Sequence, residues 1–547
     1  KTMNYTGVIS QAVDAGYQFI VVLGGSGRKL RAQTQARIDE GLLGRCTVKN
    51  KYVGAGKIKL KDANGQDVKY KTITSLTTSH DGSDSKRDGD FSVNSKQVAG
   101  YNTDWNENTQ THIVILKKNK AILNNFLDWI EKIQENKEDK EELSLLLIDD
   151  ECDYASIDTN KADELDDILE EDYEASAINE CITKILKKFK WRSYLGYTAT
   201  PYGNIFQRRD INEIDESLFP RDYIIYLEPN RMYFGPNEFF NSHNEEDPVN
   251  LIKAVPGEDS DYFYNITSTW REICNKKKLR GTKDDTDEEK EEKKALRKQE
   301  LIEILNNFEN DRAPSSLSKA IQTFILSCAI RWKRGERKVF NSMLIHIDRI
   351  VLYQDFLIRM IDREFSIIKN KIENQNIDKL KKIYINDFIE TTNNVINSEE
   401  IEDGIKIGID ELTEFEKLMP SINEVIDRIS IVKEFGKSKN TRLDFSDDKK
   451  GNFYICIGSD VLSRGLTLEG LTISYFLRAA KTYDTLMQMG RWFGYRVGYL
   501  DVCRVYTTPT IIDFFNKVKE ANNKMYKMFQ DMQERDEIPE NFGMFIL

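Results

Sequence analysis

The residues best suited to chemistry are acidic side chains that directly follow an apolar run, LLLI at residues 145–148. They are Asp149, Asp150, Glu151 and Asp153. The apolar run predicts a buried strand, and ligands of parallel sheets bind beyond the carboxyl ends of their strands. A carboxylate there can hold Mg²⁺, and a neighbouring Glu can orient and deprotonate water for nucleotide hydrolysis. We therefore assign Asp150 to a metal and Glu151 to a catalytic base, although an acidic turn that caps a helix has the same pattern.

Three other stretches place hydroxyl or guanidinium groups after expected strands. Thr198 and Thr200 lie in YTATP at residues 197–201, which suits a tight loop that senses phosphate state or a plain strand exit. Arg464 lies in GSDVLSRGLTLEGL and Arg491 in LMQMGRWFGYR. An arginine that enters a cleft can stabilise charge on a transferring phosphoryl group, whereas an isolated arginine more commonly forms a surface salt bridge. Four such stretches in this order favour phosphoryl chemistry.

The elements that must position these residues alternate between apolar strands and amphipathic helices. Strands are expected at residues 19–23, 112–116, 145–148 and 193–197, and a second run begins at residues 342–347. Strands this apolar, separated by helices, predict parallel sheets covered on both faces. We expect an α/β fold with two parallel-sheet lobes and mostly helical insertions. The expected parts are residues 1–205, an insertion at 206–335 with a charged run at 276–300, a second lobe at 336–510 with an insertion at 352–449, and a helical segment at 511–547.

Composition narrows the class of protein. The 547 residues carry a formal net charge of −12, which argues against a generally basic nucleic-acid binder but leaves room for a local basic groove. Seven cysteines without a CxxC pair make zinc ribbons and a disulfide framework poor expectations, and four histidines make a histidine-rich metal site equally poor. No apolar run is long enough to cross a bilayer, so we expect no membrane partner. The scattered cysteines favour a reducing cytosol, so we expect a cytoplasmic protein.

The motifs together resemble known families. DDECD, TATP, SDVLSRGLTLEGL and QMGRWFGYR are similar to motifs II, III, V and VI of superfamily 2 helicases. More closely, KTMNYTG, LRAQTQARIDEG, LLLIDDECDYAS, GYTATPYGN and LMQMGRWFGYRVGYLDVCRVY resemble the Z1 domain family, a helicase-like group of bacterial restriction and phage-defence operons that carries an endonuclease label. This resemblance covers nearly the whole chain, and the insertions least.

The resemblance implies two RecA-like lobes with ATP between them and nucleic acid across their tops. Asp150 would then coordinate Mg²⁺, and Glu151 would be the catalytic base. Thr198 and Thr200 would couple the lobes, and Arg464 would line the cleft or the strand path. Motif VI would supply Gln488 and Arg491, with Arg491 as the arginine finger.

Two departures from the helicase pattern affect these assignments. Lys1 and Thr2 resemble the last two residues of a P-loop, with Thr2 a second metal ligand beside Asp150, but the preceding glycines are missing. A chain that begins here is expected to bind ATP weakly, because those glycines let backbone N–H groups wrap the phosphates. In motif VI the spacing also differs, so Arg496 is an alternative to Arg491 as the nucleotide contact.

Basic residues after two expected strands are candidates for contacts to nucleic-acid phosphates. Arg28, Lys29 and Arg31 follow the first strand, and Lys117 and Lys118 follow the second. Solvated loops are the alternative. Phosphate contacts would make affinity fall with salt.

These features lead to an ATP-dependent DNA translocase or helicase-like motor that needs ATP and Mg²⁺. It would act on double-stranded or partly single-stranded DNA with nuclease or modification partners encoded in a defence operon. One alternative is an endonuclease in its own right, although we find no acidic-plus-lysine nuclease constellation apart from the acidic stretch at residues 149–153. The other alternative is a degenerate helicase fold that serves as a scaffold or DNA-binding platform.

Overall fold

The computed structural model divides into two compact units, which are described separately. Unit 1 comprises residues 1–224 with 538–541, and unit 2 comprises residues 225–537 with 542–547. The structure describes residues 2–25, 27–57, 73–81, 89–95, 98, 111–135, 143–153, 170–205, 218–241, 249–279, 281, 285–348, 350–433, 453–458, 468–478 and 483–539.

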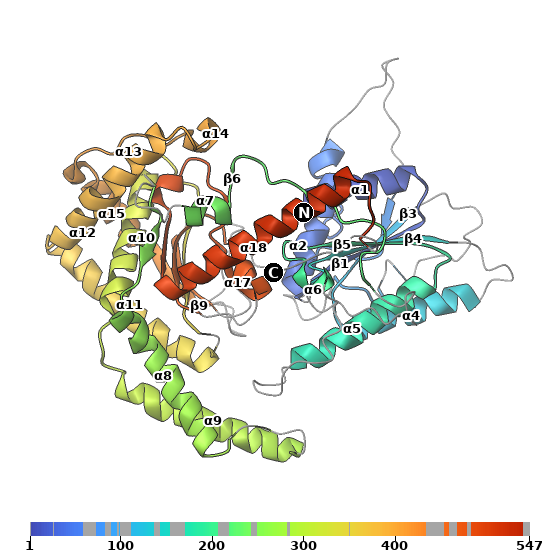
Figure 1. Cartoon of the computed structure of the whole chain (residues 1–547), viewed down its shortest axis with the longest axis horizontal. Coiled ribbons are helices and arrows are strands. Elements are labelled where there is room, and N and C mark those ends of the chain that lie inside the picture. The colour runs from blue at the N-terminus through green and yellow to red at the C-terminus, as the bar shows by residue number, and fades with distance from the viewer. Residues whose placement is uncertain are drawn as a thin grey trace. The chain divides into compact units, whose positions relative to one another are not determined.

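Unit 1 is built on a five-stranded parallel sheet (Figure 1). Its strands, in spatial order, are β2 (Ile73–Ser75), β3 (Thr111–Leu116), β1 (Phe19–Gly24), β4 (Ser144–Asp150) and β5 (Trp191–Tyr197). Since all strands are parallel, their carboxyl ends meet at one edge of the sheet. The chain builds β2 and β3 on one side of β1 and β4 and β5 on the other, so the topological switch point lies at β1.

Alternation along the strands gives unit 1 a core on each face of its sheet. Phe19, Val21 and Leu23 of β1 pack towards α4 (Lys120–Glu135) and α5 (Glu170–Lys187), which run side by side in Figure 1. Ile20 and Val22 pack on the opposite face, towards α1 (Thr2–Asp14) and α2 (Arg28–Ile38). This period of two explains why the strands are apolar at every position. Other helical elements in the described ranges of unit 1 are a π-helical turn at Asp39–Leu43, a 3₁₀ turn at Gly54–Lys57 and α6 (Tyr202–Ile205).

Unit 2 contains a six-stranded parallel sheet and a separate pair of two-residue antiparallel strands. The sheet order is β7 (Ile252–Ala254), β13 (Arg504–Thr507), β11 (Leu471–Phe476), β8 (Asn341–His346), β10 (Phe453–Ile457) and β9 (Ile429–Lys433). The antiparallel pair joins β6 (Tyr233–Phe234) to β12 (Gly494–Tyr495). The two parallel sheets confirm the expected α/β fold with two lobes.

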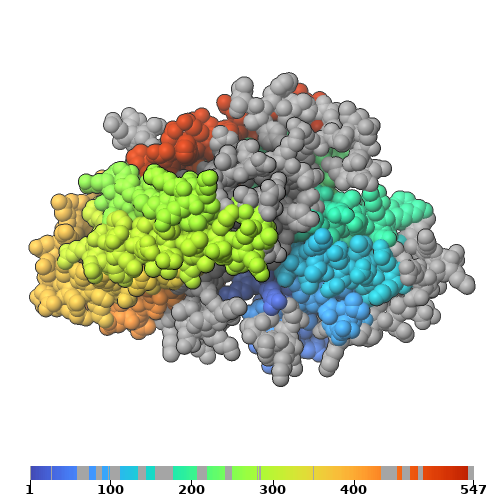
Figure 2. Space-filling model, turned by 90° about the horizontal axis from the view of Figure 1, so that it is seen from below, coloured from blue at the N-terminus to red at the C-terminus, as the bar shows by residue number. Residues whose placement is uncertain are grey.

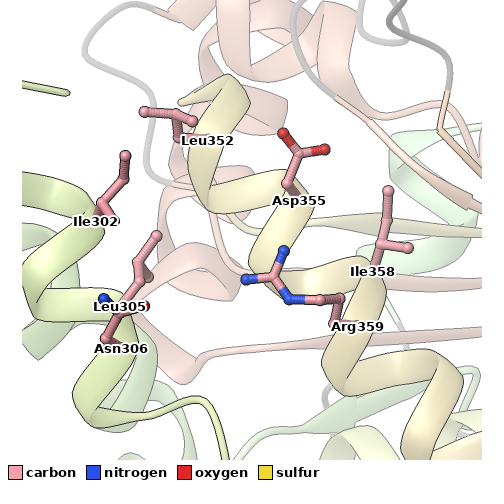
Figure 3. Close-up of a pocket in the computed structure, with 7 residues that line it drawn as sticks. All are labelled: Ile302, Leu305, Asn306, Leu352, Asp355, Ile358 and Arg359. Atoms are coloured by element: carbon pink, nitrogen blue, oxygen red, sulfur yellow. The ribbon is translucent and has the colours of Figure 1, made fainter. Parts of the chain in front are cut away.

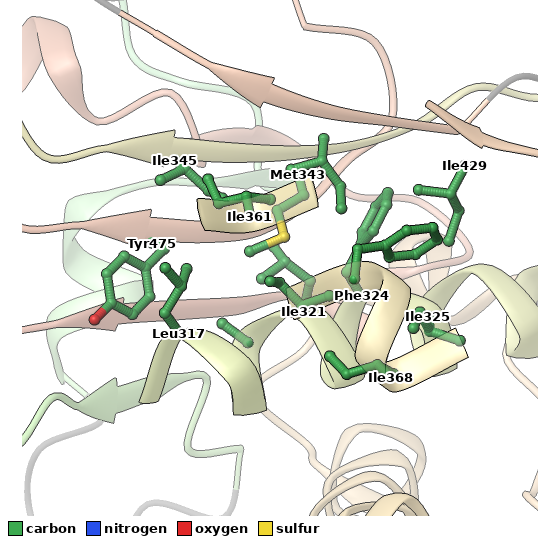
Figure 4. Packing of buried hydrophobic residues seen from close by; sticks show 14 of the residues in the cluster. Leu317, Ile321, Phe324, Ile325, Met343, Ile345, Ile361, Ile368, Ile429 and Tyr475 are labelled. Carbon is green, nitrogen blue, oxygen red and sulfur yellow. The ribbon is translucent and has the colours of Figure 1, made fainter. Parts of the chain in front are cut away.

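The helices of unit 2 cover both faces of its sheet. Those in the described ranges are α7 (Pro236–Asn241), α8 (Gly257–Lys276), α9 (Asp287–Asn307), α10 (Ser315–Lys333), α11 (Val351–Glu373), α12 (Asp378–Ile383), a π-helical segment (Tyr384–Ile389), α13 (Glu390–Asn397), α14 (Asp403–Lys406), α15 (Met419–Ile426), α17 (Tyr483–Met489) and α18 (Pro509–Glu534), with 3₁₀ turns at Phe415–Lys417 and Leu500–Val502. Figure 4 shows α10 at the centre of one core, where Ile321 and Phe324 pack near Met343 of β8.

Two expectations about the insertions can be compared with this fold. The sequence predicts that residues 206–335 form an insertion outside the second lobe. In the structure, β7 and α10 from this range belong to the sheet and the core of unit 2. Within the charged run, α9 begins at a capping box in which Thr286 and Glu289 bond each other's backbone N–H groups. The α8–α9 pair lies on the surface, as the yellow-green ridge in Figure 2 shows. Of the helices in the described ranges, none has both the length and the apolar character to cross a membrane.

Candidate functional site

The carboxyl edge of the unit 1 sheet brings together residues from four strand ends. Lys117 and Lys118 follow β3, Asp150 ends β4, and Thr198 follows β5. Gly24 at the end of β1 is paired in register with Asp150. This edge includes the switch point at β1, where open α/β sheets bind their ligands. The sequence motifs of unit 1 therefore share one site.

Tyr5 joins the two oxygens expected to bind a metal. Its hydroxyl lies 3.3 Å from Thr2 Oγ1 and 3.3 Å from Asp150 Oδ2. Burial, followed by the negative charge of Asp150, raises the pKa of Tyr5, so the hydroxyl keeps its proton. Arg37 also donates to Thr2 Oγ1, over 3.2 Å. The sequence pattern gives no signal that the Tyr5 hydroxyl reaches this edge.

These oxygens are suited to a hard cation. Mg²⁺ prefers oxygen ligands and is usually held by one or two protein groups together with substrate phosphates and water. The Thr2 hydroxyl and the Asp150 carboxylate supply that kind of donor. In the part of the chain that the structure describes, no group of three or more His, Cys, Asp and Glu side chains is placed to hold a metal.

Lys118 is buried and takes part in an internal ion pair. Its Nζ lies 2.6 Å from Asp149 Oδ1, and both side chains are fully buried. Tyr194 donates to the other carboxylate oxygen of Asp149 over 2.9 Å, and burial with the Asp149 charge raises the pKa of Tyr194. The expectation that Lys118 contacts nucleic acid is therefore wrong, because its charge does not reach solvent. The signal that could have indicated this was the extra carboxylate, Asp149, inside the strand.

Glu151 has an unusual backbone conformation. Its φ of +57° lies in the left-handed region, which costs energy for residues other than glycine. Lys118 donates to the Glu151 carbonyl oxygen over 2.6 Å, and the next N–H, of Cys152, donates to Tyr197 O over 3.2 Å. The turn that carries Glu151 is thus fixed from both sides. Its side chain is partly exposed at the edge.

Asp153 connects the acidic turn to the two threonines. Thr198 donates to Asp153 Oδ1 over 2.8 Å, and Thr200 donates to Asp153 Oδ2 over 2.7 Å. The Thr200 N–H also donates to Thr198 Oγ1 over 2.8 Å. Asn204 donates to the Cys152 carbonyl over 3.1 Å. Hydrogen bonds therefore join the loop after β5 to the turn after β4.

The remaining basic candidates of unit 1 differ in exposure. Arg31 is fully buried, and its guanidinium donates to Thr78 O over 2.8 Å and to His80 O over 2.6 Å. It anchors a loop of this unit, so the expected phosphate contact is wrong. Arg28 is exposed, while Lys29 and Lys117 are partly exposed. Only these three basic candidates have access to solvent.

The two arginines of motif VI, Arg491 and Arg496, differ in burial. Arg496 is buried, and its guanidinium donates to Trp492 O over 2.8 Å and to Tyr499 Oη over 2.8 Å. These contacts close the loop after α17, and they leave Arg496 unavailable to a nucleotide. The expectation of Arg496 as an alternative nucleotide contact is therefore wrong. Arg491 and Gln488 are partly exposed. Trp492 packs on Phe476 and Phe515 within unit 2, with ring centroids 5.2 and 5.5 Å away.

Two expected site residues, Lys1 and Arg464, lie outside the described residues. An apolar hollow elsewhere in unit 2, between α9 and α11, carries no expected site residue (Figure 3). Arg359 at its rim is already paired with Glu309, with Nε 2.7 Å from Oε1. The edge of the unit 1 sheet remains the best-formed site.

Comparison with known proteins finds a family match for part of the chain, mostly within unit 2. No curated protein matches the chain. The motifs of unit 1 that carried the resemblance lie outside the family match. Residues 316–547 match the family model described as the Z1 domain, so most of unit 2 is similar to that family.

Proposed function

We propose that this protein is a nucleic-acid-dependent ATPase, a helicase-like motor that acts on DNA with nuclease or modification partners of a defence operon. The observation that carries the proposal is the placement of Thr2 and Asp150 around one Tyr5 hydroxyl, directly before Glu151. A metal ligand, a second oxygen donor and a potential base in this order meet the needs of nucleotide hydrolysis.

The acidic turn would carry the chemistry. Thr2 and Asp150 would hold Mg²⁺, which neutralises charge on the phosphates when it is bound. Glu151 would orient the attacking water and accept its proton. Buried Tyr5 would keep the two oxygens apart at a fixed spacing.

The Asp153 network would transmit the state of the site. Any shift of the acidic turn when phosphate leaves would move Thr198 and Thr200, because both bond the same carboxylate. The threonine loop would pass this change to the rest of the motor. In unit 2, Arg491 is our candidate for the arginine that stabilises charge on the phosphoryl group, with Gln488 beside it in motif VI. Arg464 remains a candidate to line the cleft or the strand path.

Nucleic acid would bind through phosphate contacts. Arg28, Lys29 and Lys117 have solvent access and follow the carboxyl ends of β1 and β3. Three cations on neighbouring loops can follow a phosphate backbone, and their contribution would weaken with salt. The overall charge of −12 makes such a local basic surface necessary.

DNA-stimulated ATP hydrolysis tests the proposal, measured on the natural full-length protein and its Glu151→Gln variant. We expect turnover that DNA increases and that the substitution abolishes. The same change at Glu131, a half-exposed residue of α4 that pairs with Lys188 at 2.7 Å, is the matched control and should leave turnover unchanged. DNA cleavage that persists in Glu151→Gln would favour a separate nuclease site. DNA binding without any hydrolysis would favour a scaffold.

A further inference from the structure

We infer that Lys118 is a positioning residue for the catalytic base, acting through the backbone of Glu151; this inference rests on the proposed ATPase. Its ammonium group binds the carbonyl of the residue whose side chain must reach the water.

The burial of Lys118 requires a specific partner. An ammonium group removed from water loses much of its solvation free energy, unless an opposite charge and hydrogen bonds replace the lost water. Asp149 supplies the charge at 2.6 Å, and Tyr194 holds the second oxygen of Asp149 at 2.9 Å. This arrangement fixes the Nζ atom in one place, which a lysine on the surface would not achieve.

In this position Lys118 binds the backbone of Glu151, which has a strained conformation. The Glu151 carbonyl accepts from Nζ over 2.6 Å while Glu151 has a φ of +57°. A left-handed backbone at a residue other than glycine persists only when its surroundings hold it. The charged hydrogen bond is about twice as strong as a neutral one and so favours this conformation. Without this hydrogen bond, we expect the backbone of Glu151 to rotate into a more favourable region of φ and ψ. The Glu151 carboxylate would then move with it.

The rate of hydrolysis depends on the position of the base as well as on its presence. A general base must lie within about 2.6–3.2 Å of the group that it deprotonates, and a misplacement of about 1 Å can cost about 100-fold in rate. Rotation of the peptide at Glu151 would displace the carboxylate by a distance of that order. Loss of the Lys118 bond should therefore lower kcat while nucleotide affinity stays nearly the same.

The test compares variants that remove the donor with a control that does not. Lys118→Met alone leaves Asp149 buried and unpaired, so the main variant is the double change Lys118→Met with Asp149→Asn, which removes both charges. Lys118→Arg tests conservative replacement. Lys188→Met is the matched control, since Lys188 is a half-exposed lysine of unit 1 that pairs with Glu131.

We expect the folded double variant to have kcat about 100-fold below wild type, with KM for ATP changed less than about twofold. Lys118→Arg should recover part of kcat, and Lys188→Met should equal wild type. A crystal structure of the double variant should show Glu151 outside the left-handed region.

Other results would overturn the inference. These are a double variant with kcat within twofold of wild type although Glu151→Gln abolishes hydrolysis, or an unchanged φ at Glu151 in the crystal structure. If Glu151→Gln itself hydrolyses ATP at the wild-type rate, the proposed function fails first and the inference falls with it. The Glu151→Gln measurement therefore distinguishes the two failures.

Discussion

The Tyr5 hydroxyl lies 3.3 Å from Asp150 Oδ2, although the two residues are 145 positions apart in the chain. This contact joins α1 to the end of β4. It brings the helix N-terminus, with Thr2, to the acidic turn.

Tyr5→Phe should weaken the metal site and leave the fold intact. The ring, which packs edge-on against Tyr197 at 5.4 Å, is retained, so the loss of stability should be about 1 kcal/mol or less. Without the hydroxyl, Thr2 and Asp150 lose their common contact, and we expect the Mg²⁺ concentration for half-maximal ATPase to rise several-fold. Titration of activity with Mg²⁺ measures this. Tyr17→Phe is the control, because Tyr17 loses a hydroxyl that bonds Ser193 instead. Identical Mg²⁺ dependence in Tyr5→Phe and wild type would contradict the role given to the hydroxyl.

Arg28 and Arg31 should give opposite results when each is changed to Ala. Arg28 is exposed, so its loss should leave unfolding unchanged, weaken DNA binding and lower the slope of log affinity against log salt by about one. Arg31 is buried and bonds two carbonyl groups, so its loss should lower the melting temperature. Thermal unfolding and DNA titrations at several salt concentrations separate the two effects. A normal melting temperature for Arg31→Ala would show that the buried anchor has been assigned wrongly.

Arg491 and Arg496 should likewise separate catalysis from folding. Arg491→Ala should reduce kcat by about 1000-fold if Arg491 acts as the finger, with little change in thermal unfolding. Arg496→Ala should instead lower the melting temperature, because its guanidinium bonds carbonyl and hydroxyl oxygens across the loop. ATPase rates and calorimetry on both variants check this. The assignment fails if Arg496→Ala remains as stable as wild type yet loses all hydrolysis.

His112 should make the stability of unit 1 sensitive to acid. Burial lowers its pKa from 6.5 to about 4. The unfolded chain therefore binds more protons than the folded one between these values, so stability is complete above pH 6.5 and falls as the pH drops towards 4. The contribution is about 3 kcal/mol, at about 1.36 kcal/mol per pKa unit. His112→Phe should reduce the fall in urea-unfolding free energy between pH 6.5 and 4.5. An equal fall in both proteins would show that His112 is not responsible.

The strands could be predicted from sequence because burial on both faces leaves a simple signal. Phe19 to Leu23 and Leu145 to Ile148 are apolar without interruption, and both form central strands. The short strand β7 gave little signal, since it contains three residues and pairs with a strand about 250 residues later. Its place in the second sheet depends on that long-range pairing.

The site was predictable at the level of residue type and strand end, but not of side-chain contacts. Asp150, Glu151, Thr198 and Thr200 come to one edge because parallel strands end there. The burial of Lys118 left one sequence signal, Asp149 inside the next strand, but their pairing depends on the fold, because β1 lies between β3 and β4 in the sheet. The reach of the Tyr5 hydroxyl likewise depends on how the helix packs on the sheet.

The most direct measurement of the central claim is the rate of ATP hydrolysis, with and without DNA, by the natural protein and by Glu151→Gln. The account predicts that DNA raises the wild-type rate and that the variant is inactive under both conditions while its melting temperature is unchanged. A variant that hydrolyses ATP at the wild-type rate, or a wild type that does not hydrolyse it, would contradict the account.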